Sequence, residues 1–373
     1  MGKKTEFLYL NEQDTIDAGV LDAGACVDNA QDVFEILGRG DYLMGGSLHN
    51  SHGIGLIFPK ESKFPNMPLA GPDRRFFSMM AYVGGRFDVC GDKWYGSNAA
   101  NKEKGLPRSI LTVVLNDKDT GEPLSLMAAN LISAARTGAV SGVGARHLAR
   151  EDSQVCAVIG CGPINRSCFR SIYSQRKGIR KVICNDIVEE KAAEFAEYIR
   201  KDFGIEAVTS FDYEETVRDA DIISVAASRI KPVYIKKEWA KEGAAFLITG
   251  PVQADYEFWT ETKIVLDHVE LHKNYVAEAV ASGDKEGYYA GVIGGPMYTL
   301  IDEGSLPKLE DFAGMGPFLL GEAEGRKDEK EIVVFVACGM AVFDVGLSYD
   351  IYKNALSKGI GKSLTLWDEP SQA

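Results

Sequence analysis

The chain has 373 residues, of which 45% are hydrophobic and 25% are charged, a balance typical of a globular protein and not of a disordered chain, a collagen or a coiled coil. Its 54 acidic residues outnumber its 41 basic ones, so the formal net charge of −13 argues against nucleic acid or an anionic membrane as a partner. The length is enough for two or three domains.

The start of the chain and its cysteines indicate a cytoplasmic protein. No apolar signal-peptide stretch follows the first six residues, and no apolar run reaches the roughly 18 residues of a transmembrane helix. The seven cysteines are odd in number and irregularly spaced, which favours reduced thiols over a disulfide framework. We therefore expect a cytoplasmic location and no membrane partner.

The first 130 residues predict a region of mixed strands and helices. The expected strands, the last two joined by a turn-rich hairpin link, are Arg75–Tyr82, Ser109–Asn116 and Pro123–Ala128. A long helix is expected over Ala128–Arg150, broken or bent near Gly138 and leading into the next region.

The middle of the chain alternates between strand and helix patterns. The expected strands are Val155–Ile159, Lys181–Cys184, Ala207–Thr209, Ile222–Ala226, Ala245–Ile248 and Ile264–Leu266. The expected helices are Ile164–Gln175, Glu189–Phe203 and Tyr213–Arg218. This alternation predicts a parallel, doubly wound α/β sheet of the Rossmann type.

The end of the chain predicts a strand over Glu331–Ala337 and a helix over Met340–Leu356. Chain termini of compact proteins often lie close together, so this tail could pack against the N-terminal region. We therefore expect a nucleotide domain over residues 137–330 and an α+β domain built from residues 1–136 and 331–373.

A glycine-rich turn follows the strand Val155–Ile159 and predicts a dinucleotide site. The turn reads Gly160-Cys161-Gly162-Pro163-Ile164-Asn165, with Asn165 at the position of the third glycine of the usual fingerprint. Glycines permit a tight turn and close approach of the backbone to a pyrophosphate, and the helix N-terminus favours negative charge. We expect the cofactor to contact Gly160, Gly162, Pro163, Ile164 and Asn165.

Asp186 predicts the identity of the cofactor. It lies 24 residues after Gly162, close to the spacing of a ribose-binding acid. Its carboxylate would repel a 2′-phosphate and no cation follows it, so NAD is favoured over NADP. Further cofactor contacts are expected at Ile187, Ala226 and Ser228. The alternative is that Asp186 only caps the helix that begins near Glu189.

Five segments, in order along nearly the whole chain, resemble the ornithine cyclodeaminase/mu-crystallin family. They are its lysine motif, hairpin, arginine helix, nucleotide loop and C-terminal helix start: Gly91–Asn98, Leu115–Leu124, Ala135–Gly142, Val158–Pro163 and Gly339–Asp344. Four further segments, Leu8–Asn11, Val83–Gly85, Asn130–Ser133 and Ile159–Ile164, resemble one branch of the family most. These are the siderophore-pathway N-(2-amino-2-carboxyethyl)-L-glutamate dehydrogenases, which release 2,3-diaminopropionate and 2-oxoglutarate.

The resemblance implies an NAD-dependent oxidoreductase that acts on the C–N bond of an amino acid or N-substituted amino acid through an imine. It also implies a homodimer, formed through the sheets of the substrate-binding domain. The alternatives are an ornithine cyclodeaminase, an imine or opine-type reductase, and a mu-crystallin-like ligand-binding protein. The stretch Ile248–Asp255 places Pro251 at the position of the catalytic aspartate of ornithine cyclodeaminases, with Asp255 nearby but out of register, which counts against cyclodeamination.

Four residues are candidates for the substrate site. Arg136 suits a bidentate clamp on the substrate carboxylate, although a helix arginine could instead form a surface ion pair. Lys93 could act as acid or base, or neutralise a second carboxylate; without the resemblance it would be read as an exposed loop lysine. Arg75 is expected either to bind a distal carboxylate or to form a surface ion pair, and Met79 to line the pocket or the core.

His268 and His272 have the i, i+4 spacing that places two ligands on one helix face. No third ligand is evident from the sequence, and the apolar run Ile264–Leu266 just before them suggests the end of a strand. We therefore expect no metal site.

Overall fold

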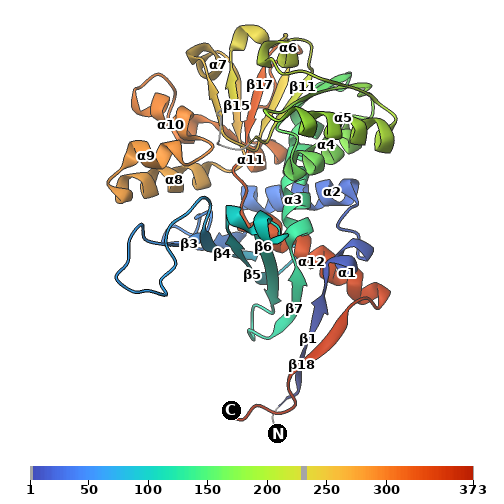
Figure 1. Cartoon of the computed structure of the whole chain (residues 1–373), viewed down its shortest axis with the longest axis vertical. Coiled ribbons are helices and arrows are strands. Elements are labelled where there is room, and N and C mark those ends of the chain that lie inside the picture. Colours follow the sequence, from blue (N-terminus) through green and yellow to red (C-terminus); the bar gives the residue numbers. More distant parts are fainter. Residues whose placement is uncertain (1–2, 228–232, 373) are drawn as a thin grey trace. The chain divides into compact units, whose positions relative to one another are not determined.

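The computed structural model describes residues 3–227 and 233–372, which form two compact units. The first unit contains residues 1–22, 41–133 and 340–373, and the second contains residues 23–40 and 134–339. Each unit is built around one large sheet (Figure 1).

The first unit is an α+β structure. Its sheet has the order β18-β1-β7-β6-β5-β4-β2, with β3 also paired to β4, and all pairs are antiparallel except β1 with β7. The strands are β1 (Thr5–Leu10), β2 (Tyr42–Met44), β3 (Ile54–Ile57), β4 (Arg75–Val83), β5 (Val89–Ser97), β6 (Ser109–Asn116), β7 (Pro123–Ala128) and β18 (Lys362–Trp367). The helices are α1 (Glu12–Asp17), α12 (Ala341–Lys358) and the 3₁₀ segment η1 (Ala99–Lys104).

Helix α12 covers one face of this sheet, where it contacts β4, β5 and β6. The helix is apolar at its start, and every residue from 341 to 348 is buried. On β5 the side chains alternate, with Lys93 on the buried face and Trp94 on the exposed one. The pairing of β18 with β1 places the last strand of the chain beside the first (Figure 1).

The second unit confirms the predicted doubly wound fold. Its sheet has the order β10-β9-β8-β11-β13-β17-β15-β16, and every pair is parallel. The strands are β8 (Val155–Ile159), β9 (Lys181–Asn185), β10 (Glu206–Thr209), β11 (Ile222–Val225), β13 (Ala245–Ile248), β15 (Lys263–Leu266), β16 (Ala313–Gly314) and β17 (Val333–Val336), with a separate pair β12 (Val233–Ile235) and β14 (Val252–Ala254). The strand order reverses at β8, so the loops after β8 and β11 form the switch point where such sheets bind ligands.

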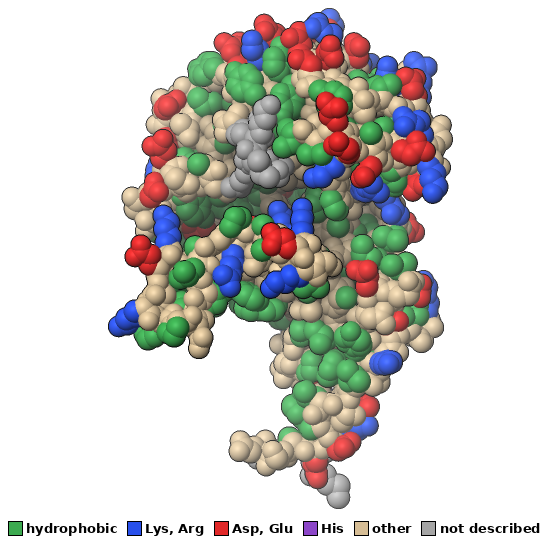
Figure 2. Space-filling view, viewed as in Figure 1, with side chains coloured by type: hydrophobic (Ala, Val, Ile, Leu, Met, Phe, Trp, Pro, Cys, Tyr) green, Lys and Arg blue, Asp and Glu red, His purple; other side chains and the backbone are tan. Residues whose placement is uncertain are grey.

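The helices of the second unit include α2 (Ala23–Arg39), α3 (Asn130–Leu148, whose first turn belongs to the first unit), α4 (Pro163–Gln175), α5 (Glu189–Phe203), α6 (Tyr213–Arg218), α7 (Tyr256–Thr260), α8 (Val269–Ser282), α9 (Lys285–Ala290), α10 (Gly295–Asp302) and α11 (Met315–Leu319). The 3₁₀ segments are η2 (Lys237–Trp239) and η3 (Leu309–Asp311). On the face shown in Figure 2, acidic and basic side chains are interspersed over this unit.

The predicted break in the long helix at Gly138 is wrong. Helix α3 is continuous over Asn130–Leu148. A Cβ at Gly138 would lie 2.4 Å from the carbonyl oxygen of Ser167 on α4. The glycine therefore serves close helix packing and does not end the helix.

The two units differ from the predicted domain boundaries in three segments, residues 23–40, 134–136 and 331–339, and the second of these carries Arg136. Helix α2 packs against α4 and α11, and β17 lies between β13 and β15 in the parallel sheet, so both belong to the second unit.

Among the described residues, no helix is both long enough and apolar enough to span a bilayer.

Candidate functional site

The glycine turn after β8 has the conformation that the nucleotide prediction requires. Gly160 has a φ of +90°, and a Cβ there would lie 2.6 Å from the Cα of Ala227, so only glycine fits. A Cβ at Gly162, by contrast, would meet no atom within 4 Å. Gly162 is the N-cap of α4, and Pro163 occupies the first turn, where the missing N–H costs nothing. The turn thus leaves open space at the N-terminus of a 13-residue helix.

Asn165 stabilises this turn through hydrogen bonds of its side chain. The residue is fully buried, and its Nδ2 donates to the carbonyl oxygens of Ile159 at 2.9 Å and Gly160 at 2.8 Å. Its Oδ1 accepts a hydrogen bond from Ser224 Oγ on β11 at 2.6 Å. The side chain at the third fingerprint position therefore links the loop after β8 to strand β11.

Asp186 lies directly after β9 and bridges two backbone segments. Its Oδ2 accepts from the N–H of Cys161 at 2.8 Å, and its Oδ1 accepts from the N–H of Val188 at 3.0 Å. The N-cap of α5 is Val188, so Asp186 braces the start of this helix without being its cap residue. Of the other predicted contacts, Ile187 is exposed, Ala226 follows β11 directly, and Ser228 lies outside the described residues.

These residues fit an NAD molecule. The positive-φ glycine, the open space at Gly162 and the helix N-terminus suit a pyrophosphate, and a carboxylate at the end of the neighbouring strand suits ribose hydroxyl groups. The roles of the individual residues stay predictions.

Lys93 is not the exposed loop lysine that its surroundings in the sequence suggest. It lies within β5, and its side chain is 2% exposed. Its Nζ lies 2.8 Å from Oδ2 of Asp344 on α12, whose side chain is fully buried, and 3.4 Å from Ser133 Oγ. The pair is an ammonium and a carboxylate removed from water, an arrangement that persists only when the charges compensate each other.

Met79 and Arg75 lie on β4, on the same face of the sheet as Lys93. Met79 is the direct cross-strand partner of Lys93 and is buried. Arg75 forms an ion pair with Asp73 at 3.0 Å, and its guanidinium lies 5.2 Å from the ring centroid of Phe77. The structure thus contains the surface ion pair that is the alternative role of Arg75.

Arg136 lies on α3 in the second unit and is 8% exposed, so it is not a solvated helix arginine. Its Nη1 is so close to Gly339 that a Cβ at Gly339 would lie 2.3 Å away. Gly339 has a φ of +77°. The guanidinium therefore lies against a bare stretch of backbone just after β17.

Asp255 does not take the place of the aspartate that Pro251 replaces. This nearest acid in the sequence is the N-cap of α7 and accepts from the N–H of Phe258 at 3.0 Å and from that of Lys237 at 3.1 Å. Its carboxylate is therefore occupied in capping, which agrees with the prediction that it is out of register.

The two histidines lie at the start of α8 and are both buried. Asp267, His272 and Cys338 offer ligand atoms within 4.8 Å of one another, a grouping that sequence spacing did not reveal. However, both ring nitrogens of His272 have hydrogen-bond partners, Asp267 Oδ1 at 2.9 Å and Tyr298 Oη at 2.7 Å. This network is complete without a cation, and the expectation of no metal site stays a prediction.

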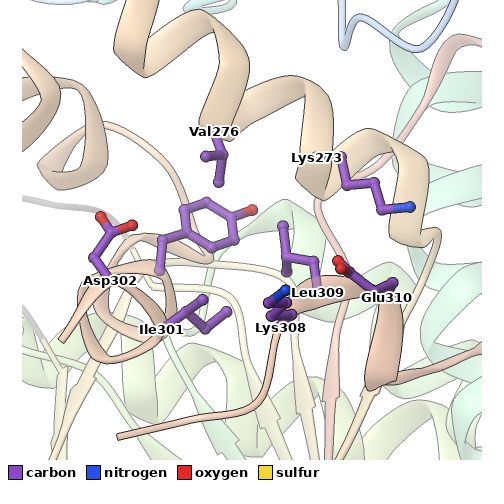
Figure 3. Close-up of a pocket in the computed structure, with 8 residues that line it drawn as sticks. Lys273, Val276, Ile301, Asp302, Lys308, Leu309 and Glu310 are labelled. Atoms are coloured by element: carbon purple, nitrogen blue, oxygen red, sulfur yellow. The ribbon is translucent and has the colours of Figure 1, made fainter. Parts of the chain in front are cut away.

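A separate pocket of about 280 Å³ lies between α8, α10 and η3 (Figure 3). In Figure 3 the side chain of Val276 points from α8 toward the space above Ile301 and Leu309. Lys273, Asp302, Lys308 and Glu310 bring charges of both signs to its rim. The predicted site residues that the structure describes do not line it.

Two residues near the predicted site escaped the sequence analysis as functional candidates, namely Asp344 and Asp267. Each is an acid next to an apolar run, Met340–Phe343 before Asp344 and Ile264–Leu266 before Asp267. Both are buried completely or nearly so, at 0% and 1% exposure. An acid next to an apolar run indicates a buried carboxylate, and buried carboxylates rarely lack a partner, so this pattern could have marked both residues as candidates.

The chain is similar to known enzymes over almost its full length. N-((2S)-2-amino-2-carboxyethyl)-L-glutamate dehydrogenase of Staphylococcus aureus is 26% identical over 366 residues, which cover 97% of this chain and 99% of the relative.

Two solved structures have the same fold. Delta(1)-pyrroline-2-carboxylate reductase of Thermococcus litoralis, in complex with NADH and L-proline, matches with a TM-score of 0.79 and 25% identity, over 96% of this chain and 100% of that one. An archaeal alanine dehydrogenase dimer with bound NAD matches with a TM-score of 0.77 and 26% identity, over 97% and 100% of the two chains.

A family model matches as well. It spans residues 26–359 and is described as the ornithine cyclodeaminase/mu-crystallin family. The resemblance carried by the five sequence segments is thereby confirmed, and the chain belongs to the ornithine cyclodeaminase/mu-crystallin family.

Proposed function

We propose that the chain is an NAD-dependent oxidoreductase that acts on the C–N bond of an amino acid or N-substituted amino acid through an imine, most like N-(2-amino-2-carboxyethyl)-L-glutamate dehydrogenase. That relative spans almost the whole chain. The class of NAD-dependent dehydrogenase in this family, predicted from the sequence, is confirmed by the relatives, two of which contain NAD or NADH in their solved structures.

The observation that carries the proposal is the buried pair of Lys93 and Asp344. A buried ion pair costs desolvation energy and stabilises a fold little compared with apolar side chains of the same size. Such a pair is therefore more readily explained by chemistry than by stability. A protein that only binds a ligand, as in the mu-crystallin alternative, has less need of it.

The reaction sets four requirements for this chain. The substrate amine must lose a proton, the Cα hydrogen must face the nicotinamide, the carboxylate must be held, and water must reach the imine. NAD⁺, when bound, accepts the hydride. We assign the carboxylate to Arg136, because a guanidinium binds a carboxylate with two parallel hydrogen bonds. We assign proton transfer, or binding of a second carboxylate, to Lys93.

The test is a panel of substrates with product identification by mass spectrometry. In the oxidative direction the panel contains N-(2-amino-2-carboxyethyl)-L-glutamate, L-alanine, L-proline and L-ornithine, each with NAD⁺. In the reductive direction it contains two mixtures with NADH, namely Δ1-pyrroline-2-carboxylate alone and pyruvate together with ammonia. We expect NADH to form or disappear with at least one member. No change in NADH with any member would refute the dehydrogenase proposal, and proline with ammonia from ornithine would favour cyclodeamination.

We also propose that the protein is a homodimer formed through the exposed face of the first sheet. This face carries a row of apolar side chains that are unusual on a surface, namely Ile54, Leu56, Phe76, Met80, Trp94 and Ile110. Phe76 and Trp94 stack at 5.5 Å between ring centroids. The dimeric alanine dehydrogenase of the same fold supports this proposal.

A cytoplasmic location remains our proposal on the basis of the thiols. None of the seven cysteines, all of which the structure describes, is in a disulfide. Cys161 and Cys156 have thiol pKa values raised above the ordinary value, chiefly by a hydrogen bond with Cys184 in the first case and by burial in the second. Such thiols are weak nucleophiles and suit a packing role.

A further inference from the structure

The backbone segment that contacts Arg136, Cys338–Gly339, is itself held by a buried carboxylate. β15 and β17 are neighbouring parallel strands, with Leu266 paired to Val336, so the residues that follow each strand lie at the same sheet edge. Asp267, directly after β15, accepts from the N–H of Cys338 at 2.7 Å and from that of Gly339 at 3.2 Å with its Oδ2. One carboxylate oxygen thus fixes the backbone on which the Arg136 guanidinium lies.

Asp267 is in turn fixed from its other side. Its Oδ1 accepts from the N–H of His268 at 2.8 Å and from His272 Nε2 at 2.9 Å. The other ring nitrogen of His272 lies 2.7 Å from the hydroxyl of Tyr298 on α10. Burial keeps the pKa of Tyr298 well above its usual value, so the phenol remains a hydrogen-bond donor. The carboxylate therefore has little freedom to rotate.

We propose that Asp267 and Gly339 are positioning residues for Arg136. The carboxylate fixes the backbone segment Cys338–Gly339, and Gly339, which has no side chain, lets the guanidinium lie against this segment in one orientation. This inference rests on the proposed function, in which Arg136 binds the substrate carboxylate. It assigns a role to an acid that neither binds substrate nor transfers a proton. A guanidinium offers two parallel N–H bonds only when its plane is set correctly, so its orientation affects carboxylate binding directly.

The test compares Gly339→Ala and Asp267→Asn with a matched control, Gly283→Ala. Gly283 also has a positive φ, +72°, but a Cβ there meets no atom within 4 Å. The control therefore carries the same backbone strain without a contact to Arg136. With Δ1-pyrroline-2-carboxylate and NADH, we expect kcat/KM to fall about 10- to 100-fold in the two variants, mainly through KM, with unchanged NADH affinity. The control should behave like the wild type.

A double variant separates positioning from a general loss of structure. If Gly339 acts through Arg136, Gly339→Ala should cost little more once Arg136→Lys is already present. The proposal would be overturned if Gly339→Ala lowered kcat/KM by the same factor in the wild type and in the Arg136→Lys variant. A raised Kd for NADH in Gly339→Ala would overturn it as well.

A second readout needs no activity. Phenylglyoxal modifies exposed guanidinium groups, and peptide mapping by mass spectrometry gives the rate at Arg136. We expect faster modification in Asp267→Asn and Gly339→Ala than in the wild type and Gly283→Ala. An unchanged rate in both variants would overturn the positioning role. If the wild type reduces no substrate, the proposed function fails, while this labelling still decides the inference.

Discussion

Lys93 and Asp344 form a charged pair inside the first unit, and their contact explains why the lysine tolerates burial. The carboxylate neutralises the ammonium at 2.8 Å, and Ser133 adds a further polar contact. Removing one partner of such a pair leaves an uncompensated buried charge, which typically costs about 3–5 kcal/mol. The glycine-rich sequence around Lys93 gave no sign of this, because the partner lies 251 residues further along the chain.

Asp186 allows a direct test of cofactor choice. We expect Asp186→Ala to weaken NAD binding and to reduce discrimination against NADP about 10- to 100-fold, because hydrogen bonds to a charged group and the repulsion of a 2′-phosphate are both lost. Asp186→Asn is the matched comparison, because it keeps an acceptor for the N–H of Cys161 while removing the charge. The measurement is kcat/KM with NADH and NADPH; unchanged values with both cofactors would contradict the ribose role.

His268 predicts a pH dependence of stability. Burial lowers its pKa to about 4, below the 6.5 of an exposed histidine. Between pH 6.5 and pH 4, His268 therefore carries a proton in the unfolded chain but not in the folded chain. The folded state is destabilised relative to the unfolded one as the pH falls from 6.5 toward 4, and it is free of this penalty above pH 6.5. The loss amounts to at most about 3 kcal/mol. The side chain of His268 makes no cap hydrogen bond at the start of α8, so His268→Asn removes the titrating ring without removing a cap. In this variant the free energy of unfolding in urea should depend less on pH between about pH 7 and pH 4.5, and an unchanged slope would contradict this origin.

At the scale of elements, the sequence pattern predicts the strands and helices around the glycine turn correctly, but it does not predict strand β5 or helix α2. Helices Glu189–Phe203 and Tyr213–Arg218 have the bounds that the sequence predicted. Strand β5 was read only as a motif, because Gly91, Asp92 and Gly96 are poor strand formers. It is a strand because its two neighbours, β4 and β6, pair with it along its whole length.

Helix α2 was not predicted, although its buried side chains repeat with helical spacing, as in Ala30, Val33, Phe34 and Leu37. Its position beside α4 and α11 could not follow from the sequence, because it inserts a segment from the N-terminal region into the parallel unit. Long-range packing of this kind leaves no local signal.

The packing of α3 against α4 gives a test with an unusual sign. Replacing glycine by alanine inside a helix ordinarily stabilises it by about 1 kcal/mol. Gly138→Ala should instead destabilise the protein by about 1–3 kcal/mol, because the new Cβ would lie 2.4 Å from the Ser167 carbonyl oxygen. Thermal or urea unfolding measures the change, and a more stable variant would show that the two helices do not need this contact.

At the scale of the whole molecule, the sequence predicted two domains and their types. Which of the two units holds each candidate site residue is known only from the structure. Arg136 and the glycine turn after β8 lie in the second unit, and Lys93 and Met79 in the first. The net charge of −13 is uninformative about the ligand, because the proposed anion contacts are individual buried or half-buried cations.

The exposed apolar face of the first sheet predicts the oligomeric state. We expect Trp94→Lys to convert the dimer to a monomer in light scattering after size-exclusion chromatography, because a charge would be buried in an apolar interface. Phe211→Lys is the matched control, since Phe211 is an exposed aromatic residue of the second unit. A monomeric wild type, or a Trp94→Lys variant that stays dimeric, would contradict the proposed interface.

The central claim is hydride transfer between NAD and the α-carbon of an amino acid. The most direct measurement supplies NADH deuterated at C4 of the nicotinamide together with the imino acid, or the keto acid and amine, that the panel identifies, and locates the label by mass spectrometry and NMR. We predict one deuterium at the α-carbon of the amino-acid product, and slower formation of this product in Arg136→Lys. NADH oxidation without label at the α-carbon, or no oxidation with any member of the panel, would contradict the account.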